Sequence, residues 1–195
     1  ILVDGDLRRP NVHRLLELPN DTGLSEILAG LVPLEHSFRN PGINNLRVIT
    51  AGPTPHNPSE LLGGTMFEAL TNKLSEMADV VIFDSPPCLP VTDPLLIGEQ
   101  AGAVILVVQA GQTRKEAIRQ ALGHLGRVNA RLLGLVVNKV SRGQGYYGYH
   151  TYYGYSSFPS SPGSQVGGGA VSAAGAGSKD RWPRFSRRPD KTHRE

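Results

Sequence analysis

The sequence predicts an α/β fold built on a doubly wound, mostly parallel sheet that is flanked by helices. Apolar runs of strand length occur at 1–3, 46–49, 80–83, 103–108 and 132–137. These runs are apolar at consecutive positions, which is typical of strands buried on both faces of a parallel sheet. Helix signals lie between them. In such a sheet the chemistry is expected at the carboxyl ends of the strands.

Three helix starts can be recognised between the strands. The residues NPSE at 57–60 supply a cap, a first-turn proline and an acid three positions after the cap. Thr113 and Glu116 form a second capping box, which opens the segment TRKEAIRQALGHLG. The residues TDP at 92–94 open a third helix. Alternation of these helices with the strands supports the doubly wound arrangement.

Composition divides the chain into three parts. Residues 1–145 carry the apolar runs and suit one domain, residues 146–155 hold a tyrosine cluster, and residues 156–195 form a tail. We expect the tail to be disordered, because its Gly, Ser, Ala and Pro residues cannot offset the entropy of ordering. Its last seventeen residues hold seven Lys or Arg and three acids. Contact with an anionic surface and a merely solvated end are both compatible with this charge.

The ends and the single cysteine give weaker indications. The chain begins with an apolar strand instead of Met, so we expect a fragment cut inside a domain. No apolar run reaches the roughly 18–20 residues that span a bilayer, and no signal peptide is visible, so the part in hand is expected to be soluble. Cys88 excludes an internal disulfide framework and fits a reducing compartment, where we interpret it as a small buried apolar residue.

All the tyrosines of the chain lie within ten residues. They are Tyr146, Tyr147, Tyr149, Tyr152, Tyr153 and Tyr155. Gly and Ser separate them and a segment unable to pack follows, so we expect the phenols to be exposed. Such a tract suggests phosphoacceptors, each gaining about −1.5 to −2 charges on phosphorylation. A sticky low-complexity tract and a stacking platform for a nucleic acid or sugar remain alternatives.

Acidic residues follow two of the predicted strands. Asp4, Asp6 and Arg8 come after the strand at 1–3, and a period of two places them on one side if the extended backbone continues. Asp84 follows the strand at 80–83. Carboxylates in this position suit Mg²⁺, and one of them can instead accept a hydroxyl proton as a general base. The structural alternative is that these acids only cap loops or pair with Arg8 and Arg9.

This set of motifs resembles the bacterial tyrosine kinases that regulate capsular and exopolysaccharide synthesis. These are P-loop proteins related to the MinD and ParA ATPases. The family's DxDxR motif matches Asp4, Asp6 and Arg8 in ILVDGDLR, and its Walker B motif matches Asp84 in VVIFDSPP. The segments NPSELL, VTDP and GLVVNKV also look like the family, and the tyrosine cluster sits where the family's autophosphorylated tail belongs. The resemblance covers residues 1 to about 155.

The resemblance implies roles for the site residues. Asp6 and Asp84 would hold Mg²⁺, and Asp4 would accept the phenolic proton, with Asp6 as the alternative base. Arg8 and Arg9 would orient the acids or contact a neighbouring subunit. The asparagine of relatives that corresponds to Asn138 binds the adenine base of ATP. The resemblance therefore makes Asn138 and Lys139 candidate nucleotide contacts. A turn-forming role for Asn138 at the end of its strand fits the sequence equally well.

One part of the family pattern is missing from the printed sequence. The Walker A loop, GxxGxGK followed by Ser or Thr, is expected upstream of Asp4 and does not occur. We therefore expect an N-terminally truncated P-loop domain that is inactive by itself, because that loop supplies the cradle for the phosphates.

The resemblance implies that the full-length protein is an ATP-dependent tyrosine autokinase that uses Mg²⁺ and modifies its own tyrosine cluster in trans. It also implies a cytoplasmic location at the inner face of the plasma membrane. The implied partners are a transmembrane co-polymerase or activator, further copies of the protein and a tyrosine phosphatase, with no nucleic acid. A MinD-like or ParA-like ATPase and a non-catalytic module of a polysaccharide export complex are the alternatives.

Overall fold

The computed structural model describes residues 1–140. The tyrosine cluster at 146–155 and the tail at 156–195 lie outside the described residues, so the predictions made for them stay predictions. Within residues 1–140, no helix combines the length and the apolar character that crossing a membrane requires.

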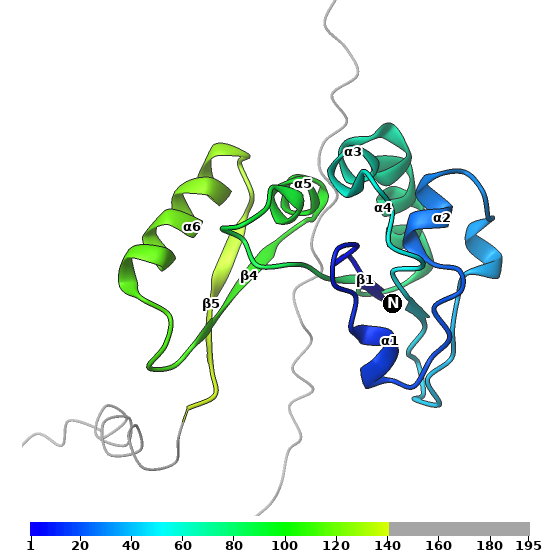
Figure 1. Cartoon of the computed structure of the whole chain (residues 1–195), viewed down its shortest axis with the longest axis horizontal. Helices are drawn as coiled ribbons and strands as arrows, with labels where there is room; N and C mark the ends of the chain where they lie inside the picture. The colour runs from blue at the N-terminus through cyan, green and yellow to red at the C-terminus, as the bar shows by residue number, and fades with distance from the viewer. Residues whose placement is uncertain (141–195) are drawn as a thin grey trace, which may run out of the picture. The chain divides into compact units, whose positions relative to one another are not determined.

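Three short strands form the first sheet, in the order β2-β1-β3. Its central strand, β1, is labelled in Figure 1. They are β1 (Leu2–Asp4), β2 (Val48–Ile49) and β3 (Ile82–Asp84). All pairings are parallel, and the register sets Val3 opposite Ile49 on one side and Phe83 on the other. The central position of β1 explains why its Val3 is fully buried.

Short helices cover this sheet. They are α1 (Val12–Leu15), α2 (Leu24–Leu28), the 3₁₀ helix η1 (Leu34–His36), α3 (Pro58–Gly63) and α4 (Thr65–Met77). The apolar face of α4 presents Phe67, Leu70 and Leu74 to the core, where all three are buried. Phe67 packs edge-on against Phe83 of β3, with 5.6 Å between the ring centroids. The core of the protein therefore lies between β1, β2 and these helices.

The remaining described elements are a second parallel sheet and the helices next to it in the chain. They are α5 (Asp93–Gln100), β4 (Val104–Gln109), α6 (Lys115–Arg127) and β5 (Leu132–Asn138). β4 and β5 pair in parallel as a two-stranded sheet. Gly98 of α5 approaches the side chains of Val104 and Leu125, at 3.4 Å and 3.7 Å from the position that a Cβ atom would occupy.

The five strands confirm the segments predicted from the sequence, and the parallel α/β class is confirmed. Two details differ. The sequence predicts strands buried on both faces, but β3, β4 and β5 expose much of their apolar surface, as at Val107 and Val137. The predicted capping box at Thr113 does not form. Helix α6 begins at Lys115. The Thr113 hydroxyl instead accepts a hydrogen bond from the backbone N–H of Gln109.

Candidate active site

Asp4 and Asp84 end two neighbouring parallel strands and lie opposite each other in register. The backbone N–H of Gly5 donates to the carbonyl of Asp84 at 2.7 Å, which ties the two strand ends together. A Cβ atom on Gly5 would lie 2.8 Å from that carbonyl oxygen and 2.9 Å from a methyl carbon of Ile97. Only glycine fits between the two strand ends without displacing a neighbour.

The carboxylate of Asp4 is fully buried. Its two oxygens accept hydrogen bonds from the backbone N–H groups of Asp6, at 3.2 Å, and Val12, at 3.1 Å. Burial raises the pKa of Asp4, and the charge of Asp84 raises it further, while the two N–H groups oppose the shift without cancelling it. Asp4 therefore anchors the loop after β1 and also has an increased affinity for a proton.

Asp6 and Asp84 complete a cluster of three acids. One oxygen of Asp6 accepts the N–H groups of Arg8 and Arg9, at 3.1 Å and 2.9 Å. The side chain of Asp84 reaches solvent, yet its partial burial raises its pKa, and the charge of Asp6 adds to the effect. Within residues 1–140, neither carboxylate forms an ion pair with a basic side chain.

The acidic cluster has the chemistry of a magnesium site. Oxygen donors with no basic partner fit a hard divalent cation, whose charge would relieve the repulsion between Asp6 and Asp84. In the part of the chain that the structure describes, no group of three or more His, Cys, Asp or Glu side chains is placed to hold a metal by itself. A cation on Asp6 and Asp84 would take its other ligands from water and phosphate, as Mg²⁺ commonly does.

Arg8 does not lie on the same side of an extended strand as Asp4 and Asp6, although the sequence predicts that it does. The chain leaves the extended conformation after Asp4, so the period of two does not continue to residue 8. The guanidinium of Arg8 instead donates two hydrogen bonds to Asp93, at 2.7 Å and 3.0 Å, and one to Ser59 at 2.9 Å. Arg8 thus joins the loop after β1 to helices α3 and α5.

Asp93 is the partner that sequence reasoning missed. Its side chain is fully buried and also accepts a hydrogen bond from the Ser59 hydroxyl at 2.7 Å. Burial by itself would raise the pKa of Asp93, but the hydrogen bonds from Arg8 and Ser59 and the positive charge of Arg8 hold it below its ordinary value. The sequence marks Asp93 only as a helix start. Its charge before a proline gives no sign of a partner 85 positions away.

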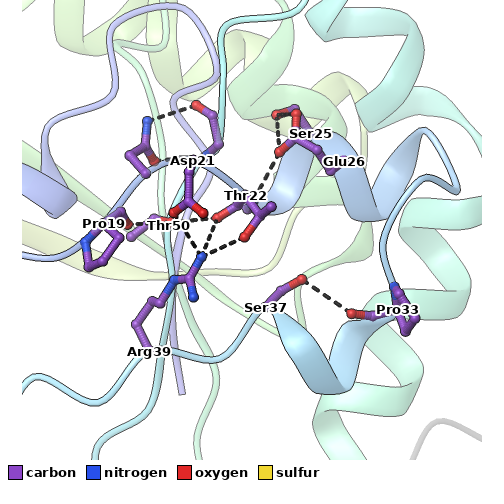
Figure 2. A network of polar contacts seen from close by, with 12 residues as sticks. Pro19, Asp21, Thr22, Ser25, Glu26, Pro33, Ser37, Arg39 and Thr50 are labelled. Carbon is purple, nitrogen blue, oxygen red and sulfur yellow. Dashed lines mark hydrogen bonds and ion pairs between the residues drawn. The ribbon is translucent and has the colours of Figure 1, made fainter.

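A second polar network fixes the loop before α2 against the segment after β2 (Figure 2). Arg39 donates to Asp21 and Thr22, and the Thr50 hydroxyl donates to the carbonyls of Pro19 and Thr22. Gly52 follows in the left-handed region, with φ +79°, a conformation that favours glycine. Side-chain hydrogen bonds therefore hold the loop before α2 and the segment after β2 together.

Asn138 and Lys139 lie at the carboxyl end of β5. The Asn138 side-chain oxygen accepts the N–H of Lys139 at 2.7 Å, and Lys139 has φ +55°. This is the geometry of a turn that closes a strand. Among the described residues, no hydrogen bond or ion pair joins Asn138 or Lys139 to the three aspartates. The cluster brought together is thus Asp4, Asp6 and Asp84.

Cys88 agrees in part with its interpretation. It is a free cysteine of intermediate exposure, and burial raises the pKa of its thiol. A raised pKa leaves less thiolate at neutral pH, so this environment does not activate the sulfur as a nucleophile.

Comparison with known proteins gives the class of the fold first. No family model matches the chain. The structure is similar to the cell-division ATPase MinD of Pyrococcus furiosus, with a TM-score of 0.61 and 21% identity over 73% of this chain and 60% of that one. This likeness shows the fold alone, which is that of the P-loop ATPases.

Closer relatives identify the family. The VpsO kinase domain has a TM-score of 0.68 and is 30% identical over 72% of this chain and 70% of its own. CapB of Staphylococcus aureus is 34% identical and the tyrosine-protein kinase YwqD of Bacillus subtilis 37% identical, each over 75% of this chain. The chain belongs to the family of bacterial tyrosine kinases.

The relatives differ in how much of their length the chain matches. It spans 65% of CapB and 64% of YwqD, which is slightly less than two thirds of each. It spans only 20% of the tyrosine-protein kinase Wzc of Salmonella typhimurium, with 34% identity. The same domain therefore occurs in short and in long family members.

Proposed function

We propose that the full-length protein is an ATP-dependent tyrosine autokinase that phosphorylates its own tyrosine cluster in trans. We further propose that it regulates capsular or exopolysaccharide synthesis and export. The observation that carries the proposal is the register of Asp4 and Asp84 at two adjacent strand ends, with Asp6 beside them and, within residues 1–140, no ion pair to Asp6 or Asp84. The family membership supports the same reaction.

The roles of the acids follow from their environments. Asp6 and Asp84 would hold Mg²⁺, which supplies charge neutralisation for the phosphates of ATP when bound. Asp4 is our candidate to accept the phenolic proton, because burial raises its pKa and a carboxylate of higher pKa is a stronger base at neutral pH. Asp6 is the alternative base, since one of its oxygens has no hydrogen-bond partner within residues 1–140.

In the proposed phosphoryl transfer, every bond that forms is matched by one that breaks. The phenol oxygen forms a bond to the γ-phosphorus, the bond from that phosphorus to the bridging oxygen breaks, and the phenolic proton passes to the carboxylate. ADP leaves with the bridging oxygen. Asn138 and Lys139 are proposed nucleotide contacts, in which the Asn138 amide would donate to and accept from the adenine edge.

Partners and location form a second layer of the proposal. The match to both YwqD and the much longer Wzc supports a transmembrane co-polymerase or activator that is either separate or fused. Trans modification requires further copies of the protein, and reversal requires a tyrosine phosphatase. These contacts would place the kinase in the cytoplasm, at the inner face of the plasma membrane.

The metal roles are tested with Asp84→Asn, Asp6→Asn and Asp4→Asn in the full-length protein. An amide keeps one oxygen but loses the charge that holds a divalent cation, so the first two variants should weaken Mg²⁺-dependent nucleotide binding by at least tenfold. Asp4→Asn should spare binding and lower phosphotyrosine formation. Asp79→Asn, at an exposed position before β3, is the matched control. Parent-like Mg-ATP binding in all three variants would contradict the site.

The acceptor role is tested by replacing all six tyrosines of the cluster with Phe. The ring is kept and only the nucleophile is lost, so ATP binding should persist while phosphotyrosine falls to background. If the parent is a MinD-like ATPase, it will release inorganic phosphate from ATP but form no phosphotyrosine. If it is a non-catalytic module, it will release no phosphate and form no phosphotyrosine. Undiminished phosphotyrosine in the six-Phe variant would place the acceptor elsewhere.

A further inference from the structure

A cavity of about 600 Å³ opens beside the loop that follows β1. It is lined by Arg8, Arg9, Pro10, Asn11, His13, Arg14, Asn20, Gly52, Pro53 and Thr54. Three of these residues are arginines and one is a histidine, while none is an acid. The cavity is therefore basic, although Asp4 and Asp6 of the candidate active site belong to the same segment of chain as its arginines.

Two of the arginines are available to a ligand. Arg9 and Arg14 are exposed, and within residues 1–140 neither side chain forms a hydrogen bond or an ion pair. Arg8 differs, because Asp93 and Ser59 already hold its guanidinium. The cavity therefore combines a fixed guanidinium with two uncommitted ones.

Two hydrogen bonds join the sides of the cavity, and one of its lining residues has a polar atom without a partner. The Asn20 amide exchanges two hydrogen bonds with the backbone of Gly52, at 2.8 Å and 2.9 Å, which joins the two sides. The Nδ1 atom of His13 is buried and has no hydrogen-bond partner among the described residues. A buried nitrogen without a partner is unfavourable, and His13 lines the cavity, so a polar ligand that reached this atom would be stabilised.

The chemistry of the lining selects a phosphate ester. Guanidinium groups bind phosphate oxygens in a bidentate manner and more specifically than ammonium groups do. The volume falls in the roughly 300–1,000 Å³ range of small-molecule sites and exceeds what one phosphate group fills. The ligand should therefore carry a bulky group on its phosphate, as a phosphorylated tyrosine does.

We propose that this cavity binds a phosphotyrosine of the tyrosine cluster of a second copy of the chain. The inference rests on the proposed function, because it concerns the product of that reaction. The peptide N–H groups of Arg8 and Arg9 bind Asp6, so the cavity adjoins the acids that would carry out transfer. A product phosphate would leave the acidic cluster, which repels it, for an adjacent basic cavity.

The spacing of the tyrosines indicates what binding in this cavity would do. Neighbouring tyrosines in the cluster are one to three residues apart, which is at most about 11 Å of extended chain. A phosphotyrosine held in the cavity would keep the next phenol within that distance. The cavity would act as a product anchor that favours successive phosphorylation of one tail.

The test measures binding of two fluorescent peptides that span residues 144–157, one with phosphate on Tyr149 and one without. The receptor is the full-length protein with its own six tyrosines replaced by Phe, so that its tail does not compete. Binding should be at least tenfold tighter for the phosphorylated peptide. Arg9→Gln with Arg14→Gln should weaken it at least tenfold. Arg119→Gln with Arg127→Gln, which removes the same charge from α6, should leave it unchanged.

Several results would overturn the proposal. Equal affinity for the two peptides would do so, and so would an equal loss in both double variants, which would indicate non-specific attraction. Free phosphotyrosine should compete with the peptide better than inorganic phosphate does. Binding to phosphatidylserine vesicles that depends on Arg9 and Arg14, without competition by phosphotyrosine, would assign the cavity to a lipid headgroup. No ATP is needed, so this test and the phosphotyrosine assay can fail independently.

Discussion

Strands β1 and β2 of the first sheet and strands β4 and β5 of the second have similar sequences and opposite environments. Val3, Val48 and Ile49 of the first sheet are fully buried, whereas Val107 of β4 and Val137 of β5 are 59% and 51% exposed. Both sets belong to runs that are apolar at consecutive positions. The apolar run thus determines that a strand forms, while the burial of that strand depends on which elements are present to cover it.

The candidate site divides along the same line. The acids Asp4 and Asp93 belong to the well-packed part of the chain, where backbone amides or Arg8 fix their positions. Asn138 and Lys139 belong to the exposed strand and are fixed only by a local turn. Asp4 is therefore preorganised, whereas the proposed nucleotide contacts lie at an exposed strand end.

The largest effect expected from this comparison is on stability. Phe67→Ala removes a fully buried ring that packs on Phe83, so it should lower the free energy of unfolding by about 3–5 kcal/mol. Val136→Ala in β5 removes a side chain that is 48% exposed and should cost less than about 1 kcal/mol. Urea denaturation of the two variants measures both values. Comparable losses would mean that β5 is covered in solution.

A smaller effect is expected at the buried ion pair. Asp93→Asn removes the charge that binds Arg8, and hydrogen bonds to charged groups contribute roughly 1.5–3 kcal/mol. Because the pKa of Asp93 is lowered on folding, its contribution is complete above its ordinary value of 3.8 and is lost as the pH falls through the lower folded value. The stability gap between the parent and Asp93→Asn should therefore close in acid. A gap that does not change with pH would exclude this charge effect.

Asp84 should show the opposite sign. Its pKa is raised on folding, so its charged form destabilises the protein, and the penalty appears as the pH rises from the ordinary value of 3.8 through the folded value. Asp84→Asn should therefore be more stable than the parent at pH 7 and equal to it in strong acid, with a difference below about 1 kcal/mol because solvent screens an exposed carboxylate. Thermal unfolding of both proteins across this pH range measures the difference. A less stable variant at pH 7 would show that Asp84 makes a compensating contact.

The sequence was sufficient for the local features of the site and insufficient for its long-range pairs. The end of each strand and the acid that follows it are local, so the location of Asp4 and Asp84 at the carboxyl edge of the sheet followed from the rule for parallel sheets. That their two strands are neighbours is known only from the structure. The partner of Arg8 did not, because a backbone bend after Asp4 redirects the side chain to a residue far along the chain. The exposure of β4 and β5 was missed for a similar reason, since a pattern of apolar residues does not report which element covers them.

The smallest effect tests whether surface charge or packing stabilises the first sheet and its helices. Lys73 and Glu35 form the shortest ion pair within residues 1–140, at 2.6 Å, but their side chains are 52% and 58% exposed. Solvent screens such a pair, and holding two long side chains in one geometry costs entropy, so a short distance does not imply a large contribution. Lys73→Gln should leave the urea midpoint unchanged, whereas Phe67→Ala in the same helix lowers it strongly. A clear shift for Lys73→Gln would show that surface pairs, and not only the buried face of α4, hold η1 against the core.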